Sequence, residues 1–477
     1  MNGPAEPKRT TEVLGAVEVP AARVPVIARA DVVVAGGGNA GVAAAVAAAR
    51  TGASVLLVER YGYLGGMTTG TFNTGPGTMF DSDGQRVLGG IGWEIEERMV
   101  ATGGALRVTG DHGFSNFPEH MKLVAQEIVL EAGVDLLLHA WLCRPLVRDG
   151  RVTAAVLLSK NGLFAVEGSV FVDATGDADL AAGAGAACET YDGATRQQVS
   201  VDLLACNVDG RKVMAWGSAH ADESWGARLP EDDGGTEGLR PPYVFIMTRP
   251  ETGGEGGAVN REGFMRRVGS MPTIKAMVRR SCVRIQGNGD GVDPTDVRAI
   301  TWTEVVGRRG ALRHLDHLKR NVPGFEDAFV VAQSPLGVRE SRRIVGEYTV
   351  TLDDWKRNAR FPDVVGLNAR GLDRHLAGTV FEYERSRGNH DIPYRSLIPK
   401  GLSNVLVAGR CVSVDHDAHA SLRGMPACWA IGHAAGTAAA LAVRAGGAVR
   451  GVDVKDLQRA LRAQGAILST QPRPDLD

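Results

Sequence analysis

The sequence has little imbalance of charge and no long apolar run. Its 477 residues carry a formal net charge of −2, which gives no electrostatic reason to expect a nucleic acid or an anionic membrane as partner. No apolar run approaches the roughly 20 residues that span a bilayer. Residues 1–24 begin with a polar stretch that does not resemble a signal peptide, so we expect a flexible tail and a cytoplasmic protein.

Paired cysteines are also missing. The six cysteines are scattered and none forms a CxxC pair, which argues against a zinc site and a redox-active dithiol. We therefore expect reduced thiols and no bound metal, with Cys188 and Cys411 as packing residues. Glycine, in contrast, is abundant at 62 residues, as in proteins whose backbone wraps closely around a large cofactor.

A glycine-rich turn follows the first apolar run. The surrounding segments predict a buried strand, an alanine-rich helix and a second strand over residues 31–35, 42–50 and 54–58. Within this unit Gly36, Gly38 and Gly41 fit the pattern GxGxxG. These glycines would allow, in turn, a tight bend, a close approach to a pyrophosphate and close packing of helix on strand. Asn39 and Ala40 lie in this turn among the predicted cofactor-binding residues, and the helix start would present free N–H groups to the phosphates.

The residues after this unit bear on which dinucleotide binds. Glu59 ends the second strand, where an acid would accept the ribose hydroxyls and disfavour a 2′-phosphate. FAD or NAD is therefore favoured over NADP. The glycine pair Gly65-Gly66, followed by Met67 and Thr68, favours FAD, because a ribityl chain and flavin ring would pass close to the backbone there.

The remaining segments predict two lobes, since the chain exceeds what one hydrophobic core usually covers. Three antiparallel strands at 142–147, 152–158 and 163–166 are followed by a buried strand at 169–173. Turns and charges increase between residues 197 and 400, with a helix at 294–319 and strands at 329–332 and 343–350. A predicted apolar strand at 404–408 and a predicted helix of small residues at 426–444 resemble the strands and the helix of the first lobe.

The predicted fold class is α/β: a Rossmann-like FAD-binding domain, whose parallel sheet carries an antiparallel meander, with an inserted α+β substrate domain. The predicted FAD-binding domain comprises residues 25–75, 117–196 and 401–450. The predicted substrate or cap domain comprises residues 76–116 and 197–400, and residues 451–477 form a C-terminal extension.

These motifs resemble the bacterial FAD-dependent oxidoreductase family of the glutathione-reductase-type flavoproteins, a superfamily that includes fumarate reductase and succinate dehydrogenase subunits. The similarity covers about residues 31–444 and is carried by segments 31–41, 65–68, 174–177, 337–344, 392–400, 404–410 and 432–440. It implies further FAD-binding positions: Arg60, Thr175, Gly176, Asp177, Gly409, Arg410, Pro426 and Ala427. One position departs from the pattern, because His433 stands where glutamine is expected; we interpret it as a residue that packs or hydrogen-bonds locally.

Some relatives attach FAD to a histidine just after the glycine pair. Residues 67–70 contain no histidine, so we predict non-covalent FAD.

Candidate catalytic residues gather in two segments. In the first, Arg423 precedes the last helix and would stabilise reduced flavin or hold a substrate carboxylate, while His416 or His419 would transfer a proton. The second group, drawn from around residue 340 and from residues 390–395, supplies Arg339, Tyr394 and Arg395. Structural alternatives stay open for all of them: a salt bridge to a loop acid for Arg423, and local packing for each histidine.

A second GxGxxG unit is absent, and with it the nicotinamide domain of a disulfide reductase. Three hypotheses follow: hydride transfer between flavin N5 and a small organic molecule (dehydrogenation or alkene reduction), a monooxygenase reaction, or a non-catalytic flavin-binding or electron-transfer subunit. The cationic and imidazole groups favour the first. Expected partners are a small-molecule substrate, NAD(P)H or oxygen as co-substrate, and a second copy in a homodimer.

Overall fold

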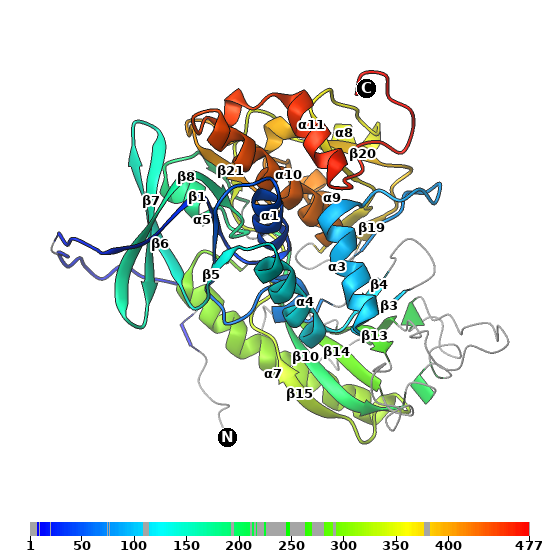
Figure 1. Ribbon diagram of the computed structural model, residues 1–477. Helices are drawn as coiled ribbons and strands as arrows, with labels where there is room; N and C mark the ends of the chain where they lie inside the picture. Colours follow the sequence, from blue (N-terminus) through cyan, green and yellow to red (C-terminus); the bar gives the residue numbers. More distant parts are fainter. Residues whose placement is uncertain are drawn as a thin grey trace.

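The computed structural model describes residues 7–8, 10–19, 21–73, 75, 77–107, 114–191, 195–209, 212–213, 216, 224–225, 245–248, 263–269, 281–289, 292–375 and 382–476. Within these residues the chain forms a larger lobe built on a seven-stranded sheet and a smaller lobe built on a six-stranded sheet. Figure 1 shows the larger lobe drawing on both ends of the chain, blue and red, and the smaller lobe on its middle, in green.

The larger sheet has the strand order β5-β2-β1-β8-β7-β6, with β21 pairing β8. Its strands are β1 (Val26–Ala35), β2 (Val55–Val58), β5 (Asp135–Leu137), β6 (Trp141–Arg148), β7 (Arg151–Ser159), β8 (Gly162–Asp173) and β21 (Val405–Val407). The parallel part, β5-β2-β1-β8-β21, is made of continuous apolar runs, which suit a sheet covered on both faces. The predicted mixed sheet is confirmed.

One strand differs from the sequence prediction. The expected strands at 163–166 and 169–173 are a single strand, β8, which pairs antiparallel with β7 and parallel with β1. Gly168 lies between the two expected strands. In the structure its place is set by packing, because a Cβ there would lie 2.9 Å from Cγ2 of Val33. One strand therefore joins the meander to the parallel sheet.

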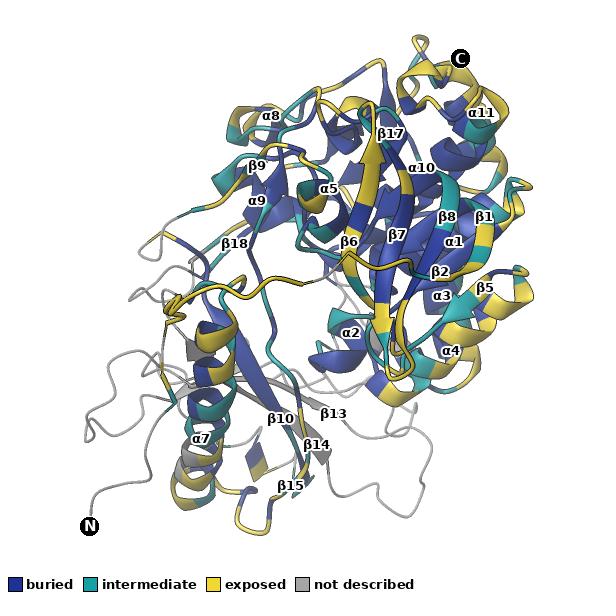
Figure 2. Ribbon diagram, turned by 90° about the vertical axis from the view of Figure 1, so that its left-hand side faces the viewer, coloured by how far each residue is buried: buried dark blue, intermediate teal, exposed yellow. Residues whose placement is uncertain are grey.

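Two helices of small residues pack against each other beside this sheet. They are α1 (Asn39–Arg50) and α10 (Met425–Arg444). Figure 2 shows them behind strands β6, β7, β8 and β1. Their backbones touch: a Cβ on Gly432 would lie 2.1 Å from the Ala40 carbonyl oxygen, and one on Gly436 would lie 2.0 Å from that of Ala44. Among the described helices, α10 alone is long and apolar enough to cross a membrane, and most of it is buried in this core.

The smaller lobe packs a long helix on an antiparallel sheet of order β11-β12-β13-β14-β10-β15. These elements are β10 (Val199–Val208), β11 (Ser224–Trp225), β12 (Phe245–Thr248), β13 (Gly263–Gly269), β14 (Ser281–Gly289), α7 (Val297–Asn321) and β15 (Phe329–Gln333). Asp296 caps α7 and accepts hydrogen bonds from Thr11 of the N-terminal segment, at 3.0 Å and 2.7 Å. Cys206 in this lobe is disulfide-bonded, so the expectation that all thiols are reduced is wrong.

The remaining elements are short or lie at the periphery. They are α2 (Met67–Gly70), α3 (Gly90–Ala101), β3 (Ala105–Arg107), β4 (Phe114–Asn116), α4 (Pro118–Glu131), α5 (Asp179–Gly183), β9 (Cys188–Glu189), β16 (Arg343–Ile344), α8 (Leu352–Lys356), β17 (Val364–Asn368), β18 (Leu372–Arg374), β19 (Glu382–Glu384), β20 (His390–Pro393), η2 (Tyr394–Leu397), α9 (His416–Leu422), η3 (Val449–Gly451) and α11 (Val454–Ala463). The strand expected at 343–350 is thus only β16.

The hydrophobic core of the larger lobe extends through segments that the sequence boundaries assign to the cap. Ile91 and Ile95 of α3 belong to it, as do Val364 and Ile392 of β17 and β20. A separate core holds the smaller lobe, with Leu203 and Phe325 among its buried residues. The second lobe is therefore centred on residues 199–338, and the segments around it fold with the larger sheet.

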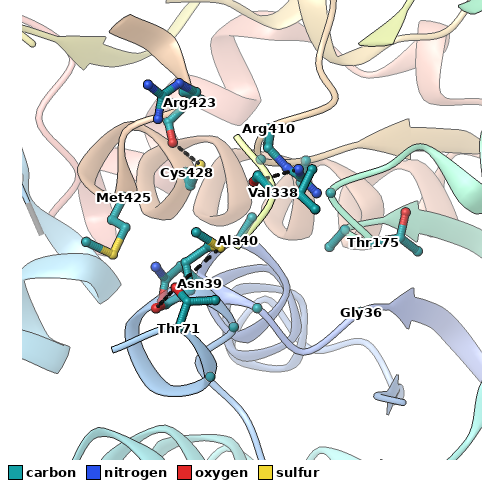
Figure 3. Close-up of a pocket in the computed structure, with 18 of the residues that line it drawn as sticks. Gly36, Asn39, Ala40, Thr71, Thr175, Val338, Arg410, Arg423, Met425 and Cys428 are labelled. Carbon is teal, nitrogen blue, oxygen red and sulfur yellow. Dashed lines mark hydrogen bonds between the residues drawn. The ribbon is translucent and has the colours of Figure 1, made fainter. Parts of the chain in front are cut away.

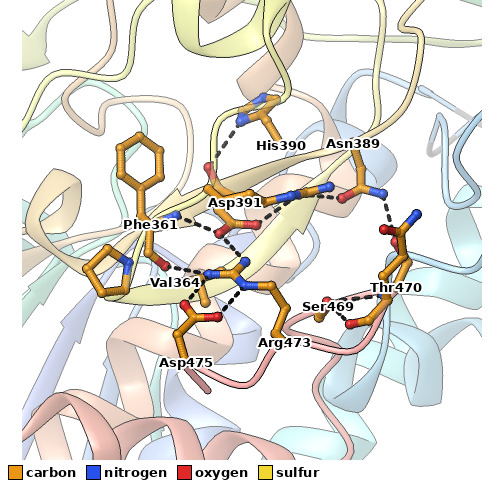
Figure 4. Close-up of polar contacts among 12 residues, drawn as sticks. Phe361, Val364, Asn389, His390, Asp391, Ser469, Thr470, Arg473 and Asp475 are labelled. Carbon is orange, nitrogen blue, oxygen red and sulfur yellow. Dashed lines mark hydrogen bonds and ion pairs between the residues drawn. The ribbon is translucent and has the colours of Figure 1, made fainter. Parts of the chain in front are cut away.

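The C-terminal segment is fastened to the larger lobe by buried polar contacts (Figure 4). The side chain of Asp391 is fully buried and ion-pairs with Arg473 at 2.9 Å and with Arg360 at 3.0 Å. It also accepts the backbone N–H of Phe361 at 2.8 Å. Asn389 Nδ2 adds a hydrogen bond to Thr470 at 3.0 Å, so the chain after α11 is anchored through a buried carboxylate and a neighbouring amide.

Candidate functional site

A cavity lies where the parallel strands end at their carboxyl side. Gly36, Thr175 and Gly409 come shortly after β1, β8 and β21, and all three line it. The empty space along it amounts to about 1660 Å³, including the part open to solvent. Its lining comes from both lobes, because Ser200 and Leu336 of the smaller lobe contribute to it.

The glycine turn forms a cradle at the start of α1. Gly36 has φ +101°, and a Cβ on Gly41 would lie 1.7 Å from the Gly36 carbonyl oxygen, so the turn and the helix touch through backbone alone. Gly38 differs, because a Cβ there would meet only the Cα of Gly66, at 3.9 Å. The face of Gly38 thus opens into the cavity beside the free N–H groups of α1, as a pyrophosphate site requires.

The residues after β2 line the end of the cavity expected for adenosine. The Glu59 carboxylate accepts the N–H of Gly37 at 2.6 Å and that of Tyr61 at 2.9 Å. Burial raises the pKa of Glu59, against the lowering effect of those hydrogen bonds. The guanidinium of Arg60 lies over the rings of Tyr61 and Trp141, at 4.9 Å and 5.2 Å. An acid and a flat cation–aromatic surface fit a ribose and a purine.

The glycine pair packs directly on the cradle. A Cβ on Gly66 would lie 2.9 Å from the Cα of Gly38, and Gly66 has φ +52°. Thr68 ties this loop to both major helices, since Asn39 Nδ2 donates to its Oγ1 at 3.1 Å and that hydroxyl donates to Met425 Sδ at 2.9 Å. Of this group, Gly66, Met67 and Asn39 line the cavity, while the neighbouring predicted residues Gly65 and Thr68 lie behind the lining.

Arg410 is fixed at the middle of the cavity. Its Nη2 pairs with Asp177 at 2.7 Å, and its Nη1 donates to the Val338 carbonyl of the smaller lobe at 2.8 Å. His419 Nε2 donates to the carbonyl of Arg410 at 2.9 Å. Burial and the nearby Arg343 hold the pKa of His419 well below its usual value, so this imidazole is neutral. His419 therefore holds the backbone of Arg410 in place, and Asp177 is the counter-ion of the Arg410 guanidinium.

A cluster of charged side chains forms the far end of the cavity. Arg423 Nη2 donates to the Asp373 carbonyl at 2.7 Å and to Gln197 Oε1 at 2.9 Å, and lies 3.5 Å from the Asp373 carboxylate. Arg370 pairs with the same carboxylate, and His375 Nε2 lies 2.9 Å from it. Figure 3 shows Arg423 and Met425 at the opposite end of the pocket from Gly36 and Thr175.

Burial sets the protonation states in this cluster. It lowers the pKa of Arg423 to about 10, which leaves the guanidinium charged near neutral pH. Burial together with the charge of Arg339 lowers the pKa of His375 to about 3, so this imidazole is neutral. Burial alone would raise the pKa of Asp373, but the charge of Arg370 and the hydrogen bond from His375 outweigh it and the pKa falls well below its usual value. The cluster therefore holds one carboxylate among cations.

The structure brings many of the predicted residues to one cavity. Its lining includes these predicted positions: Gly36, Gly38, Asn39, Ala40, Glu59, Arg60, Gly66, Met67, Thr175, Gly176, Arg339, Gly409, Arg410 and Arg423. Gly41, Gly65, Thr68, Asp177, Pro426 and Ala427 lie directly behind or beside that lining.

Other predicted catalytic residues lie elsewhere. His416 Nε2 contacts Glu340 at 3.1 Å. The buried Tyr394 hydroxyl donates to the Val449 carbonyl at 2.8 Å, and burial raises its pKa. Arg395 pairs with Asp363 at 2.9 Å. None of the three lines the cavity, because each is directed to a partner within its own part of the fold. His433 contacts Gln464 at 3.1 Å, which confirms its local role.

Sequence reasoning missed Arg370, Asp373 and His375. They follow β17 in a short charged run around Gly371, and no motif marks them. Their density of charge within six residues was the available signal. Ser200 and Leu336 of the smaller lobe also line the cavity, and no sequence signal marked either of them.

The family profile for FAD dependent oxidoreductases matches residues 31–461, nearly the whole of the described larger lobe and its insertion. The chain belongs to this family. It is an FAD-dependent oxidoreductase, and FAD is its cofactor. The cradle, the acid at Glu59 and the open face of Gly38 fit that dinucleotide.

Solved structures with similar folds have low identity to this FAD-dependent oxidoreductase. A geranylgeranyl bacteriochlorophyll reductase-like protein from Thermoplasma acidophilum is 12% identical, with 92% of this chain and 84% of that chain covered and a TM-score of 0.43. The flavin-dependent brominase Bmp2 is 14% identical, with 91% and 83% covered and a TM-score of 0.45. The p-nitrophenol 4-monooxygenase from Pseudomonas putida DLL-E4 is 12% identical, with 92% of this chain and 84% of that chain covered and a TM-score of 0.42.

No curated protein matches the sequence. Likeness at the level of these structures carries no information on substrate or reaction. The relation to fumarate reductase stays a prediction.

Proposed function

We propose that the enzyme exchanges a hydride between flavin N5 and a small organic substrate, in a dehydrogenation or alkene reduction. The observation that supports this is the continuity of the cavity. It runs from the FAD cradle to the Arg423 end, where residues of the smaller lobe, Ser200, Leu336 and Val338, complete its wall. A substrate enclosed there would lie between the cofactor and the second lobe.

Bound FAD would supply hydride exchange at N5, and the protein would supply binding, orientation and charge. Arg423 lies just before α10, whose N-terminus carries a positive partial charge. Both would favour negative charge at this end of the cavity. Neutral His375 is suited to hydrogen bonding with a substrate rather than to acting as a cationic acid, because its pKa is about 3.

The cofactor is proposed to be held without a covalent bond. The residues next to the glycine pair are Met67, Thr68 and Thr69, and none carries a nucleophilic imidazole. Acid precipitation should release the yellow colour into the supernatant. Colour that stays with the precipitated protein would contradict this part of the proposal.

The reaction type is tested with FAD-loaded protein under anaerobic conditions. Bleaching of the flavin absorbance by candidate alcohols, amines or saturated acids, or reoxidation of the photoreduced protein by activated alkenes, is the expected result. Oxygen consumption that requires both NAD(P)H and an aromatic substrate would show a monooxygenase instead. An unchanged spectrum with every candidate, together with a co-purifying partner protein, would favour a non-catalytic flavin-binding role.

A further inference from the structure

The charged cluster at the Arg423 end has more cations than anions. In the part of the chain that the structure describes, Arg370 and Arg423 share Asp373 as their one carboxylate partner. At the middle of the cavity, in contrast, Arg410 has a carboxylate of its own, Asp177, at 2.7 Å. Since His375 is neutral, the cluster keeps at least one uncompensated positive charge.

Donors in this cluster are also unused. The Nε atoms of Arg370 and Arg423 are buried and have no hydrogen-bond partner among the described residues. The side chains of these arginines are only 13% and 10% exposed, so bulk water satisfies little of either group. A buried charge and buried N–H groups without partners are costly unless a ligand completes them.

We propose that Arg370 and Arg423, with Asp373 and His375, form a subsite for the carboxylate of an anionic substrate. The planar guanidinium forks match a carboxylate better than they match a neutral carbonyl. The inference rests on the proposed function, because it places this carboxylate on the substrate and not on the cofactor.

The position of the cluster argues against the cofactor as the source of the missing charge. The pyrophosphate belongs at the Gly38 cradle, and Figure 3 places Arg423 at the other end of the pocket from Gly36. The oxidised flavin ring is neutral, so it cannot compensate the excess positive charge of the cluster. A reduced, anionic ring would offset one charge only during turnover, whereas the subsite is charged in the resting enzyme.

The test measures ligand binding to oxidised, FAD-loaded protein, without turnover. Benzoate is titrated against the flavin absorbance spectrum and by calorimetry, with neutral benzamide as the isosteric comparison and sulfate as a general oxyanion. Benzoate is expected to bind and perturb the flavin spectrum, with benzamide at least about tenfold weaker. Equal binding of benzamide would overturn the proposal. Equal binding of sulfate would overturn its assignment to carboxylates.

Three variants separate charge from simple damage to the fold. Arg370→Gln should weaken benzoate binding by about tenfold to a hundredfold, the usual range for a charged hydrogen bond. Asp373→Asn removes the carboxylate that competes with benzoate for the two guanidinium groups, and should strengthen benzoate binding several-fold. Arg29→Gln removes an exposed ion pair between β1 and Glu167 of the neighbouring strand β8, and should change nothing. FAD content and circular dichroism check that each variant is folded.

Opposite effects of the first two variants support the subsite, and equal losses in both would refute it. The result is independent of the reaction type. If carboxylates bind but no substrate exchanges a hydride with the flavin, the subsite is supported and the proposed function is refuted. If only neutral substrates are turned over, the proposed function is supported and the subsite is refuted.

Discussion

Two glycines of the same motif should fail in different ways when replaced by alanine. A Cβ on Gly41 would lie 1.7 Å from the Gly36 carbonyl oxygen, well inside any contact distance. Gly36 has little room to move away, because its other side is packed on Ala174: a Cβ built on Gly36 would lie 2.5 Å from the Ala174 carbonyl oxygen. Gly41→Ala should therefore destabilise even the apoprotein, by about 3 kcal/mol, as overpacking of a rigid contact does.

Gly38→Ala should leave the fold intact and weaken the binding of FAD. Gly38 has φ −71° and ψ −173°, which alanine adopts readily, and its Cβ would meet no atom closer than 3.9 Å. Loss of chain entropy in the unfolded state would stabilise the apoprotein by roughly 0.4–1 kcal/mol. The added methyl group would occupy the space of the pyrophosphate and cost about 1–3 kcal/mol of binding, or roughly a fivefold to 150-fold rise in Kd for FAD.

The two effects are measured separately. Urea unfolding of both apoproteins gives the stability change, and quenching of flavin fluorescence during titration gives the Kd. Wild-type affinity for FAD in Gly38→Ala would refute the placement of the pyrophosphate at this turn. Wild-type stability in Gly41→Ala would refute the contact between turn and helix.

Further predictions concern single side chains. Arg423→Ala should keep FAD but lower kcat by about a hundredfold, as loss of a preorganised charge does, with Arg29→Gln as the unchanged control; steady-state kinetics and FAD content check both. Burial lowers the pKa of His433 from 6.5 to about 4, so the stability it contributes is present above pH 6.5 and is lost as pH falls toward 4. His433→Gln should remove this loss of unfolding free energy, which amounts to up to about 1.4 kcal/mol per pH unit. Urea unfolding curves of the variant that keep the wild-type pH dependence would disprove this role of His433. Asp391→Asn should cost roughly 3 kcal/mol, because it leaves Arg473 without its buried partner, and should expose the C-terminal segment to trypsin. Asp475→Asn, on the solvent side of the same arginine, should have a much smaller effect.

The FAD cradle could be predicted because its requirements are local. Gly36, Gly38 and Gly41 are needed by a turn and a helix start that lie within a few residues of one another. Glu59 follows at the end of the very next strand. Backbone sterics and strand order place these groups together in any chain with this pattern.

The substrate end could not be predicted in the same way. Arg370, Asp373 and His375 meet Arg423 across about 50 residues of chain, and Gln197 joins them from much farther away. Their meeting depends on how β17, β18 and α9 pack, which periodicity does not encode. Tyr394 shows the converse, because a residue close in sequence to the site is turned to the Val449 carbonyl.

The backbone contact between α1 and α10 bears on how substrate reaches the flavin. With Gly432 against Ala40 and Gly436 against Ala44, neither helix can slide or tilt without a collision. The two helices that flank the cofactor thus act as one rigid block, already shaped before FAD arrives. We expect any opening that admits substrate to come from the smaller lobe, whose wall residues Leu336 and Val338 pack against a different core.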